Sequence, residues 1–429
     1  MKVKLAYGRS GMTVNMPDNR TTVIEPQFMP SIPDEAASVL HALQHPIRSR
    51  PLRHVVDADD TVAIVFCDIT RPMPNGLVLP VILAELEHVP KEHIVLINAT
   101  GTHRANTHDE LVQMLGEEIV DNYRIVNHDA FDKSTQTLVG ELEDGTPVWL
   151  NNELVHASKR IVTGFIEPHF FAGFSGGPKM VAPGVAGIDT VLELHSASLI
   201  ADPRSTWGLT DGNPLWEQIC EAARLVDVHF SLNVTINKKH QITNVFAGDL
   251  WQSHRIGVEF ARKTAMRGVA QTFDVVVTTN AGYPLDQNLY QTVKGMSAAA
   301  QIVRPGGAIV VAAECSDGIP EHGNFKKLLK QAGSADDLLS MLEQPGFKMH
   351  DQWQAQLLAL IQKKAKVYFK AGYLSDQQLR EAMLTPIGSV EETVNELLEA
   401  MGPNATVGVL PQGPMTIPFV QAHEPLALV

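Results

Sequence analysis

The chain has 429 residues, 44% of them hydrophobic, and carries a formal net charge of -14 at pH 7. This length exceeds the usual size of one domain and supplies ample apolar side chains for a core, so we expect two domains. The acidic balance argues against nucleic acid or an anionic membrane as a partner. The three cysteines have no CxxC spacing, the N-terminus lacks an apolar signal segment, and no apolar run is long enough to span a membrane. These features predict a cytoplasmic protein that does not enter a membrane.

Short apolar runs alternate with helix-like patterns along the chain, which indicates an α/β fold with mainly parallel sheets. In the first part of the chain, the expected strands are residues 61–67, 93–99 and 160–166, and the expected helices are 75–88 and 111–120. The run from Thr107 to Glu110 has the form of a capping box, which marks the start of the second helix.

Polar side chains follow each of these three strands at its carboxyl end. Asp68 and Arg71 follow the first strand, His103 follows the second, and Glu167 and His169 follow the third. Open α/β sheets bind their ligands at this edge, so we expect these side chains to converge on one site. The alternative interpretation is that Asp68 caps a helix and the histidines are satisfied core residues.

Residues 164–179 add a glycine-rich bend and an amine to the same region. Gly173, Gly176 and Gly177 allow positive φ and close approach of the backbone to a ligand, which would bring Lys179 and His169 against a bulky bound molecule. The bend is not a phosphate loop, because a proline separates the glycines from the lysine and no Ser or Thr follows it. No GxGxxG follows the first strand, and no HExxH pair is present.

A second series of elements begins after residue 272. Its expected strands are 274–280, 306–313 and 405–410, and its helix-like runs are 325–342 and 390–401. We therefore expect an N-terminal domain over 1–271, a C-terminal α/β domain over 272–411, and a tail, 412–429, that could return to the N-terminal domain. The active-site cleft is expected between the two domains.

The loop at residues 280–286 precedes a helix that carries Tyr290, Gln291 and Lys294. Their spacing places all three on one helix face, and the preceding strand end favours a face turned to the ligand. Trp353 could form an aromatic wall of the site, although a core tryptophan is an equally good interpretation.

Several blocks of this sequence, in order, resemble the nickel-dependent lactate racemases, a family that uses a nickel-pincer nucleotide. The resemblance covers nearly the whole chain. The blocks are Asp68–Pro72, Gly101–Arg104, Gly164–Gly177, Lys179, His195–Ser196 and Gly282–Met296.

The resemblance implies a racemase or epimerase of a 2-hydroxy acid that works by reversible hydride transfer from Cα through a 2-keto acid. It implies a cofactor, pyridinium bisthiocarboxylic acid mononucleotide with nickel, attached covalently to Lys179 in the N-terminal domain, with His195 as the metal ligand. His103 and His169 match the catalytic acid and base. Arg71 and Lys294 match the residues that hold the substrate, with Tyr290 and Gln291 beside them. We further expect Asp68, Gly176, Gly177 and Tyr290 to contact the cofactor, and Gln291 and Trp353 to contact the substrate. Cofactor-synthesis and nickel-insertion proteins are the implied partners.

The chain departs from the family pattern at Pro178, where a basic residue is usual, and at Ile69, where histidine is common. Both positions flank the expected site, so the resemblance predicts the reaction class more firmly than the substrate. Two other functions stay open. One is a divalent-metal-dependent hydrolase or lyase that uses His103, His169 and His195. The other is a protein that stores or delivers nickel or the cofactor.

Overall fold

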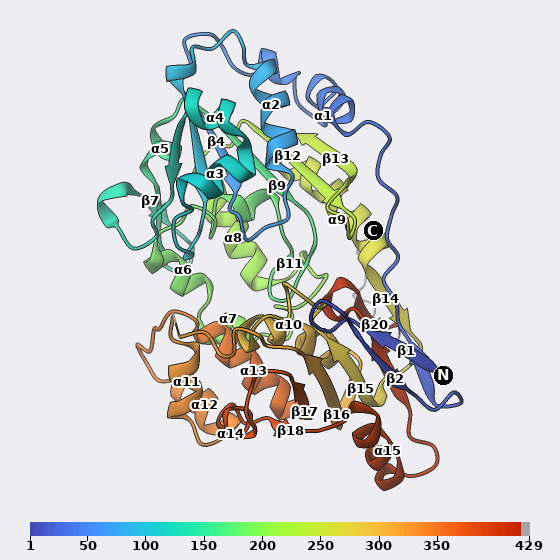
Figure 1. The fold of residues 1–429 in the computed structure, drawn as a ribbon. Coiled ribbons are helices and arrows are strands. Elements are labelled where there is room, and N and C mark those ends of the chain that lie inside the picture. The colour runs from blue at the N-terminus through green and yellow to red at the C-terminus, as the bar shows by residue number, and fades with distance from the viewer. Residues whose placement is uncertain (322, 422–429) are drawn as a thin grey trace. The chain divides into compact units, whose positions relative to one another are not determined.

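The computed structural model describes residues 1–321 and 323–421, which form two compact units (Figure 1). Unit 1 comprises Met1–Gln27, His195–Leu209 and the chain from Ala265 onward, and unit 2 comprises Phe28–Leu194 and Thr210–Thr264. Each unit contains a six-stranded sheet with helices packed on it. The expected α/β class with mainly parallel sheets is therefore confirmed.

The sheet of unit 2 has the strand order β13-β12-β9-β4-β5-β6 and is parallel except for the β12–β13 pair. Its strands are β4 Val62–Cys67, β5 Ile94–Ala99, β6 Arg124–Asn127, β9 Lys159–Phe165, β12 Phe230–Ile236 and β13 Ile242–Gly248. All six residues of β4 are buried, as expected for a central strand that is covered on both faces. Two small hairpins complete the unit: β7 Gln136–Glu141 with β8 Pro147–Asn151, and β10 Pro168–His169 with β11 Gly173–Phe174.

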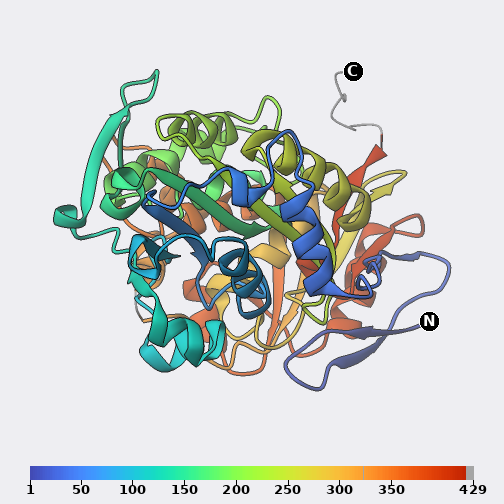
Figure 2. The ribbon, with the colours of Figure 1, turned by 90° about the horizontal axis from the view of Figure 1, so that it is seen from above.

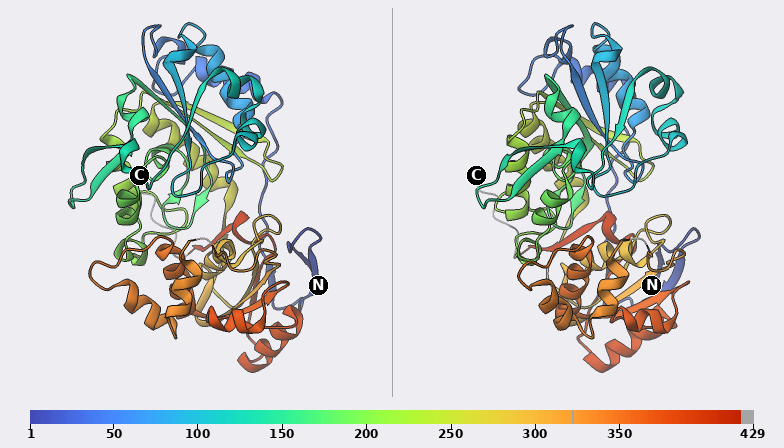
Figure 3. Two further views of the ribbon diagram at one scale, coloured as in Figure 1. Left: turned by 60° about the vertical axis from the view of Figure 1, so that its left-hand side comes forward. Right: turned by 90° about the vertical axis from the view of Figure 1, so that its left-hand side faces the viewer.

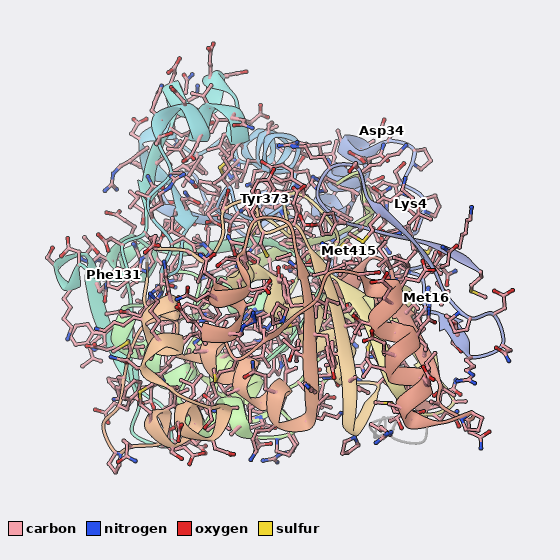
Figure 4. The ribbon with its side chains drawn as sticks, turned by 60° about the horizontal axis from the view of Figure 1, so that its bottom comes forward. Lys4, Met16, Asp34, Phe131, Tyr373 and Met415 are labelled. Atoms are coloured by element: carbon pink, nitrogen blue, oxygen red, sulfur yellow. The ribbon has the colours of Figure 1, made fainter. Side chains whose placement is uncertain are left out.

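The helices of unit 2 are mostly short. They are α1 Glu35–Gln44, α2 Asn75–Glu85, α3 His108–Leu115, α4 Glu117–Asn122, α5 Asn152–His156, α6 Ile188–Leu194, α8 Pro214–Arg224 and α9 Leu250–Ala265. The last residue of α9, Ala265, begins the third segment of unit 1. The β7–β8 hairpin extends outward from the sheet (Figure 2). Phe131, which is 57% exposed, lies near it (Figure 4).

The sheet of unit 1 is parallel throughout, with the order β18-β17-β16-β15-β19-β3. Its strands are β3 Thr21–Val23, β15 Phe273–Thr279, β16 Val303–Ala313, β17 Ala365–Ala371, β18 Thr385–Pro386 and β19 Val407–Leu410. Two strand pairs lie outside this sheet: β1 Lys2–Leu5 with β2 Met12–Asn15, and β14 Met266–Val269 with β20 Ile417–Val420. Alternate residues of the sheet, such as Val275 and Val277, share a buried cluster with the β1–β2 hairpin and α15.

The helices of unit 1 are α7 Ala197–Ala201, α10 Leu289–Ala300, α11 Phe325–Gln331, α12 Ala335–Leu342, α13 Gln352–Lys364, α14 Asp376–Glu381 and α15 Val390–Met401. The orange helices α11, α12 and α13 pack against one another (Figure 3). None of the helices in the described part of the chain combines the length and apolar character that crossing a bilayer requires.

The two units are not the domains expected from the sequence, 1–271 and 272–411. The first 27 residues group with the later chain because β3 pairs with β19 in the sheet of unit 1. Within the tail, β20 pairs with β14, so residues up to 421 also lie in unit 1. Residues 422–429, the rest of that expected tail, lie outside the described residues.

Most expected elements are present, and two helices differ from expectation. The capping box is confirmed, since Thr107 accepts from Glu110 N and Glu110 accepts from Thr107 N. The helix expected over 111–120 breaks at Gly116, whose φ of 87° ends α3 before α4 begins. The run 325–342 likewise forms two helices, α11 and α12, and α12 is capped anew by Ser334.

Candidate active site

Three adjacent parallel strands of unit 2 deliver the predicted polar residues to one edge of the sheet. The strands β9, β4 and β5 are neighbours in the strand order and run in the same direction. Asp68 directly follows β4, His103 follows β5 after a short turn, and His169 follows β9 on the small strand β10. The three strand ends therefore lie at the same edge of the sheet in unit 2, and a single site built from all of these side chains stays a prediction.

Asp68 and His103 form a hydrogen-bonded pair at this edge. Nδ1 of His103 donates to Oδ2 of Asp68 at 2.9 Å, and Thr70 donates its hydroxyl to Oδ1 at 2.8 Å. The Asp68 side chain is 2% exposed, whereas that of His103 is 42% exposed. Burial alone would raise the pKa of Asp68, but the hydrogen bond and charge of His103, with the charge of Arg71, lower it below its usual value. Asp68 is therefore an anion that orients an accessible imidazole.

An asparagine network connects the loop of Asp68 to the loop of His103. Oδ1 of Asn106 accepts from Ile69 N at 3.2 Å and from Asn98 Nδ2 at 2.8 Å. Asn98 Nδ2 also donates to Asn127 Oδ1 at 2.7 Å, and that oxygen accepts from Asn106 N. Asn98 and Asn127 lie on the paired strands β5 and β6. The network thus fixes both loops to the sheet below them.

His169 has a different kind of partner. Its Nδ1 accepts hydrogen bonds from the backbone N–H groups of Phe171 and Ala172, both at 3.2 Å. Its ring also stacks on Phe170 with centroids 4.6 Å apart. Glu167 contributes its backbone to the bend, since its carbonyl accepts from Ser175 N at 2.9 Å. An orienting role for the Glu167 carboxylate stays a prediction.

The bend at Gly176 and Gly177 has positive φ at both residues, 75° and 51°. Added Cβ atoms would lie 2.6 Å from Asn233 Oδ1 and 2.5 Å from the ring of His254, respectively. Both neighbours are themselves fixed. Asn233 Oδ1 accepts from Gly177 N at 2.9 Å, and His254 Nε2 donates to Ser175 O at 2.8 Å. Only glycine fits this backbone, which positions the short helix Gly177–Met180 and its lysine.

The side-chain amine of Lys179 has an unusually low pKa. Desolvation, together with the smaller effect of the nearby charge of Arg71, lowers its pKa to about 7. Among the described residues no hydrogen bond or ion pair holds this ammonium group. Arg71 also acts on Asp68, so the three side chains share one electrostatic environment. Near neutral pH a large share of Lys179 is the free amine, which is the nucleophilic form.

Unit 1 collects a second set of the predicted residues. The ring of His195 lies against Trp353 with centroids 4.8 Å apart, and the His195 backbone carbonyl accepts from Gln352 Nε2 at 3.2 Å. Trp353 Nε1 donates to the hydroxyl of Tyr290 at 3.3 Å. Tyr290 is further held by Gln354, which donates to its backbone carbonyl. Trp353, at 8% exposed, is thus both a core residue and a neighbour of the predicted metal ligand.

Tyr290, Gln291 and Lys294 share one face of α10, as expected. They are half-buried, while most of the other residues of this helix are buried. Asn288 caps this helix, and the fully buried Asp286 in the loop before it accepts from Gly8 N and Glu314 N. Within the described ranges no group of three or more His, Cys, Asp or Glu side chains is placed to hold a metal ion.

Several residues that shape the site are absent from the sequence prediction: Asn98, Asn106, Asn127, Asn233, His254 and Gln352. One usable signal was an amide inside an apolar strand, as at Asn98 and Asn233, because a buried amide has to be hydrogen-bonded. His254 and Gln352 lie on helices whose patterns give no comparable signal.

The fold is α/β, and unit 2 combines histidines held by hydrogen bonds with a desolvated amine at Lys179. The family model described as the lactate racemase N-terminal domain matches residues 7–208, and the one described as the lactate racemase C-terminal domain matches 269–417. The chain therefore belongs to the lactate racemase family, and it is an isomerase.

Individual relatives agree with this assignment. The lactate racemase of Thermoanaerobacterium thermosaccharolyticum is 33% identical over 96% of this chain and 97% of its own length. That of Lactiplantibacillus plantarum is 34% identical over 88% of this chain and 90% of its own. The structure of the T. thermosaccharolyticum lactate racemase apoprotein matches with a TM-score of 0.91 and 32% identity, covering 97% of this chain and all of that one. A Thermotoga maritima protein, at 17% identity over 92% of this chain and all of that one, shares the fold with a TM-score of 0.67.

Proposed function

We propose that the protein interconverts the two enantiomers of a 2-hydroxy acid, with lactate as the first candidate substrate. Two relatives that cover most of the chain are named lactate racemases. The observation that carries the proposal is the arrangement in unit 2, where an oriented Asp68–His103 pair and the desolvated amine of Lys179 share the influence of Arg71.

The residues of the chain fit a nickel-pincer nucleotide as the cofactor. Lys179 has the neutral amine that a covalent thioamide requires, and the glycine bend beside it leaves no room for side chains. His195 supplies an imidazole, a donor that suits nickel. When bound, the cofactor supplies an acceptor for the hydrogen that leaves Cα with its electron pair. Cofactor-synthesis and nickel-insertion proteins are then the proposed partners.

The remaining chemistry belongs to the side chains of the protein. A carbanion at Cα would be costly next to a carboxylate, so the hydrogen leaves as hydride while an imidazole takes the hydroxyl proton. His103 and His169 are the proposed proton-handling groups. Arg71 can grip the substrate carboxylate with two parallel hydrogen bonds, and Lys294 can hold a carboxylate or keto oxygen by its charge. Tyr290, Gln291 and Trp353 are proposed to line the site beside Lys294.

The test is expression of the chain together with the cofactor-making proteins, followed by intact mass and racemisation of L-lactate and larger 2-hydroxy acids. We expect added mass on the peptide containing Lys179, and retention of a deuterium label at Cα during inversion. Lys179→Arg replaces the amine with a guanidinium that stays protonated, and should lose both the added mass and the activity. Full activity of unmodified protein with zinc or manganese alone would refute the proposal. Tight cofactor binding without any inversion would instead indicate a delivery protein.

A further inference from the structure

The two proposed proton-handling histidines are held through the same ring nitrogen by opposite kinds of partner. At His103, Nδ1 faces a carboxylate oxygen of Asp68, which can only accept a hydrogen bond. At His169, Nδ1 faces the backbone N–H groups of Phe171 and Ala172, which can only donate. A neutral imidazole carries its one hydrogen on either Nδ1 or Nε2, and the partner of one nitrogen decides which.

We infer that His103 and His169 are held in opposite tautomers, so that they enter the reaction as unlike groups. His103 carries its hydrogen on Nδ1 and presents a lone pair at Nε2. His169 carries its hydrogen on Nε2 and presents a donor there. The tautomers follow from hydrogen bonds within unit 2 alone, while their catalytic meaning rests on the proposed function.

Asp68 makes His103 the proton acceptor of the resting protein. When Nε2 takes the substrate hydroxyl proton, the O–H bond breaks, its electron pair stays on oxygen, and an N–H bond forms. The imidazolium that results keeps its Nδ1 hydrogen on Asp68, whose negative charge balances the new positive charge. The asparagine network holds the two loops in place for this contact. Asp68 is thus a positioning residue for His103.

His169 cannot accept a proton at Nε2 in the same way, because that nitrogen already carries one. A base at Nε2 would need the hydrogen on Nδ1, where it would point at the N–H groups of Phe171 and Ala172. Both backbone hydrogen bonds would then have to break. In the arrangement described here, His169 therefore donates a hydrogen bond to the oxygen of the bound hydroxy or keto acid. Its role as a base requires a rearrangement of the β10–β11 hairpin or of the ring.

The test is long-range ¹H–¹⁵N NMR of the imidazole nitrogens in the ¹⁵N-labelled full chain without cofactor, at pH 8. His103→Gln and His169→Gln assign the two sets of signals. We expect the Nδ1 signal of His103 at a protonated-type shift and that of His169 at an unprotonated-type shift. The same tautomer at both residues, or the reverse pair, would overturn the inference. The wild-type spectrum decides this without any racemase activity, so a failure of the proposed function would be recognised separately.

Asp68→Asn gives a second measurement with an internal control. The asparagine amide can donate to Nδ1, so the His103 signals should shift to the pattern of His169, while the His169 signals stay in place. Unchanged His103 signals in a folded Asp68→Asn protein would show that Asp68 does not set the tautomer. If this variant does not fold, the wild-type spectrum still decides between the outcomes.

Discussion

Asn233 Oδ1 accepts a hydrogen bond from Gly177 N at 2.9 Å, and a Cβ added to Gly176 would lie 2.6 Å from the same oxygen. One amide oxygen therefore both binds the bend and limits its side chains. Asn233 lies on β12, opposite Gly164 of β9, so this hydrogen bond joins the bend directly to a strand of the sheet. The position of Lys179 thus depends on strand pairing as well as on the loop that carries it.

Gly177→Ala should destabilise unit 2 and abolish cofactor attachment. The new Cβ would lie 2.5 Å from Cδ2 of the buried His254, at a φ of +51° that alanine adopts with difficulty. Overpacking and backbone strain together should lower the free energy of unfolding by about 2–4 kcal/mol. Chemical denaturation measures this loss. Gly145→Ala is the matched control, because Gly145 also has positive φ but nothing lies within 4 Å of its added Cβ.

The control should lose only the strain contribution, about 1 kcal/mol. Equal losses in the two variants would show that contact with His254 does not constrain the bend.

Asn106→Ala should lower the activity by more than its loss of stability alone would explain. It removes the oxygen that accepts from Ile69 N and Asn98 Nδ2, and so releases the loop of Asp68 from the loop of His103. Loss of the acceptor for one buried and one half-buried donor should cost about 2–4 kcal/mol in the free energy of unfolding. The informative readout is kcat of the protein carrying cofactor, measured well below the unfolding temperature. Asn122→Ala, at an exposed helix end, should change neither quantity appreciably.

Acid should lower the free energy of unfolding because the buried His254 resists protonation in the folded chain. Burial lowers the pKa of His254 to about 4, opposed only in part by its hydrogen bond to Ser175 O. Between pH 6.5 and 4 the unfolded chain binds more protons at this residue, so the free energy of unfolding falls as pH falls through that window. The contribution is about 3 kcal/mol when the window has been crossed.

His254→Gln can keep a donor to Ser175 O but does not titrate. Its unfolding free energy should therefore differ from that of wild type by an amount that changes between pH 8 and pH 4.5. Parallel pH profiles for the two proteins would contradict the prediction.

Lys179→Met should stabilise the chain that lacks cofactor. Because the pKa of Lys179 is lowered from 10.5 to about 7, the unfolded chain binds more protons between those values, and stability rises with pH across them. At pH 6 the folded protein bears the full cost of a desolvated ammonium, which methionine removes. We expect a gain on the order of 2–4 kcal/mol at pH 6 that shrinks towards pH 10, measured by denaturant unfolding. Lys239→Met, at an exposed position, should show no such pH-dependent gain.

The sequence predicts the part of the site that depends on strand order. Buried apolar runs such as Val62–Cys67 indicate parallel strands, and parallel strands place the residues that follow them at one edge. Asp68, His103 and His169 are therefore found where expected. The helix face of Tyr290, Gln291 and Lys294 is predictable for a similar reason, since helical spacing is local.

Partners that come from distant parts of the chain could not be predicted in this way. Asn233 and His254 follow the glycine bend by more than 50 residues, and nothing in their local pattern specifies that contact. The sequence also did not indicate that the Asp68 carboxylate accepts a hydrogen bond from His103; contact of Asp68 with the cofactor stays a prediction. The asparagine network likewise depends on the pairing of β5 with β6, which the sequence analysis does not include.

The pairing of β3 with β19 also bears on how the protein is made. Thr21–Val23 is translated more than 300 residues before its sheet neighbour Val407–Val409. Throughout most of synthesis this β-strand has an open edge, a form that invites association with other nascent polypeptides. The Phe28–Leu194 and Thr210–Thr264 segments are complete much sooner. Chaperones that act during translation should therefore bind unit 1, whose segments are far apart in the sequence, more than unit 2.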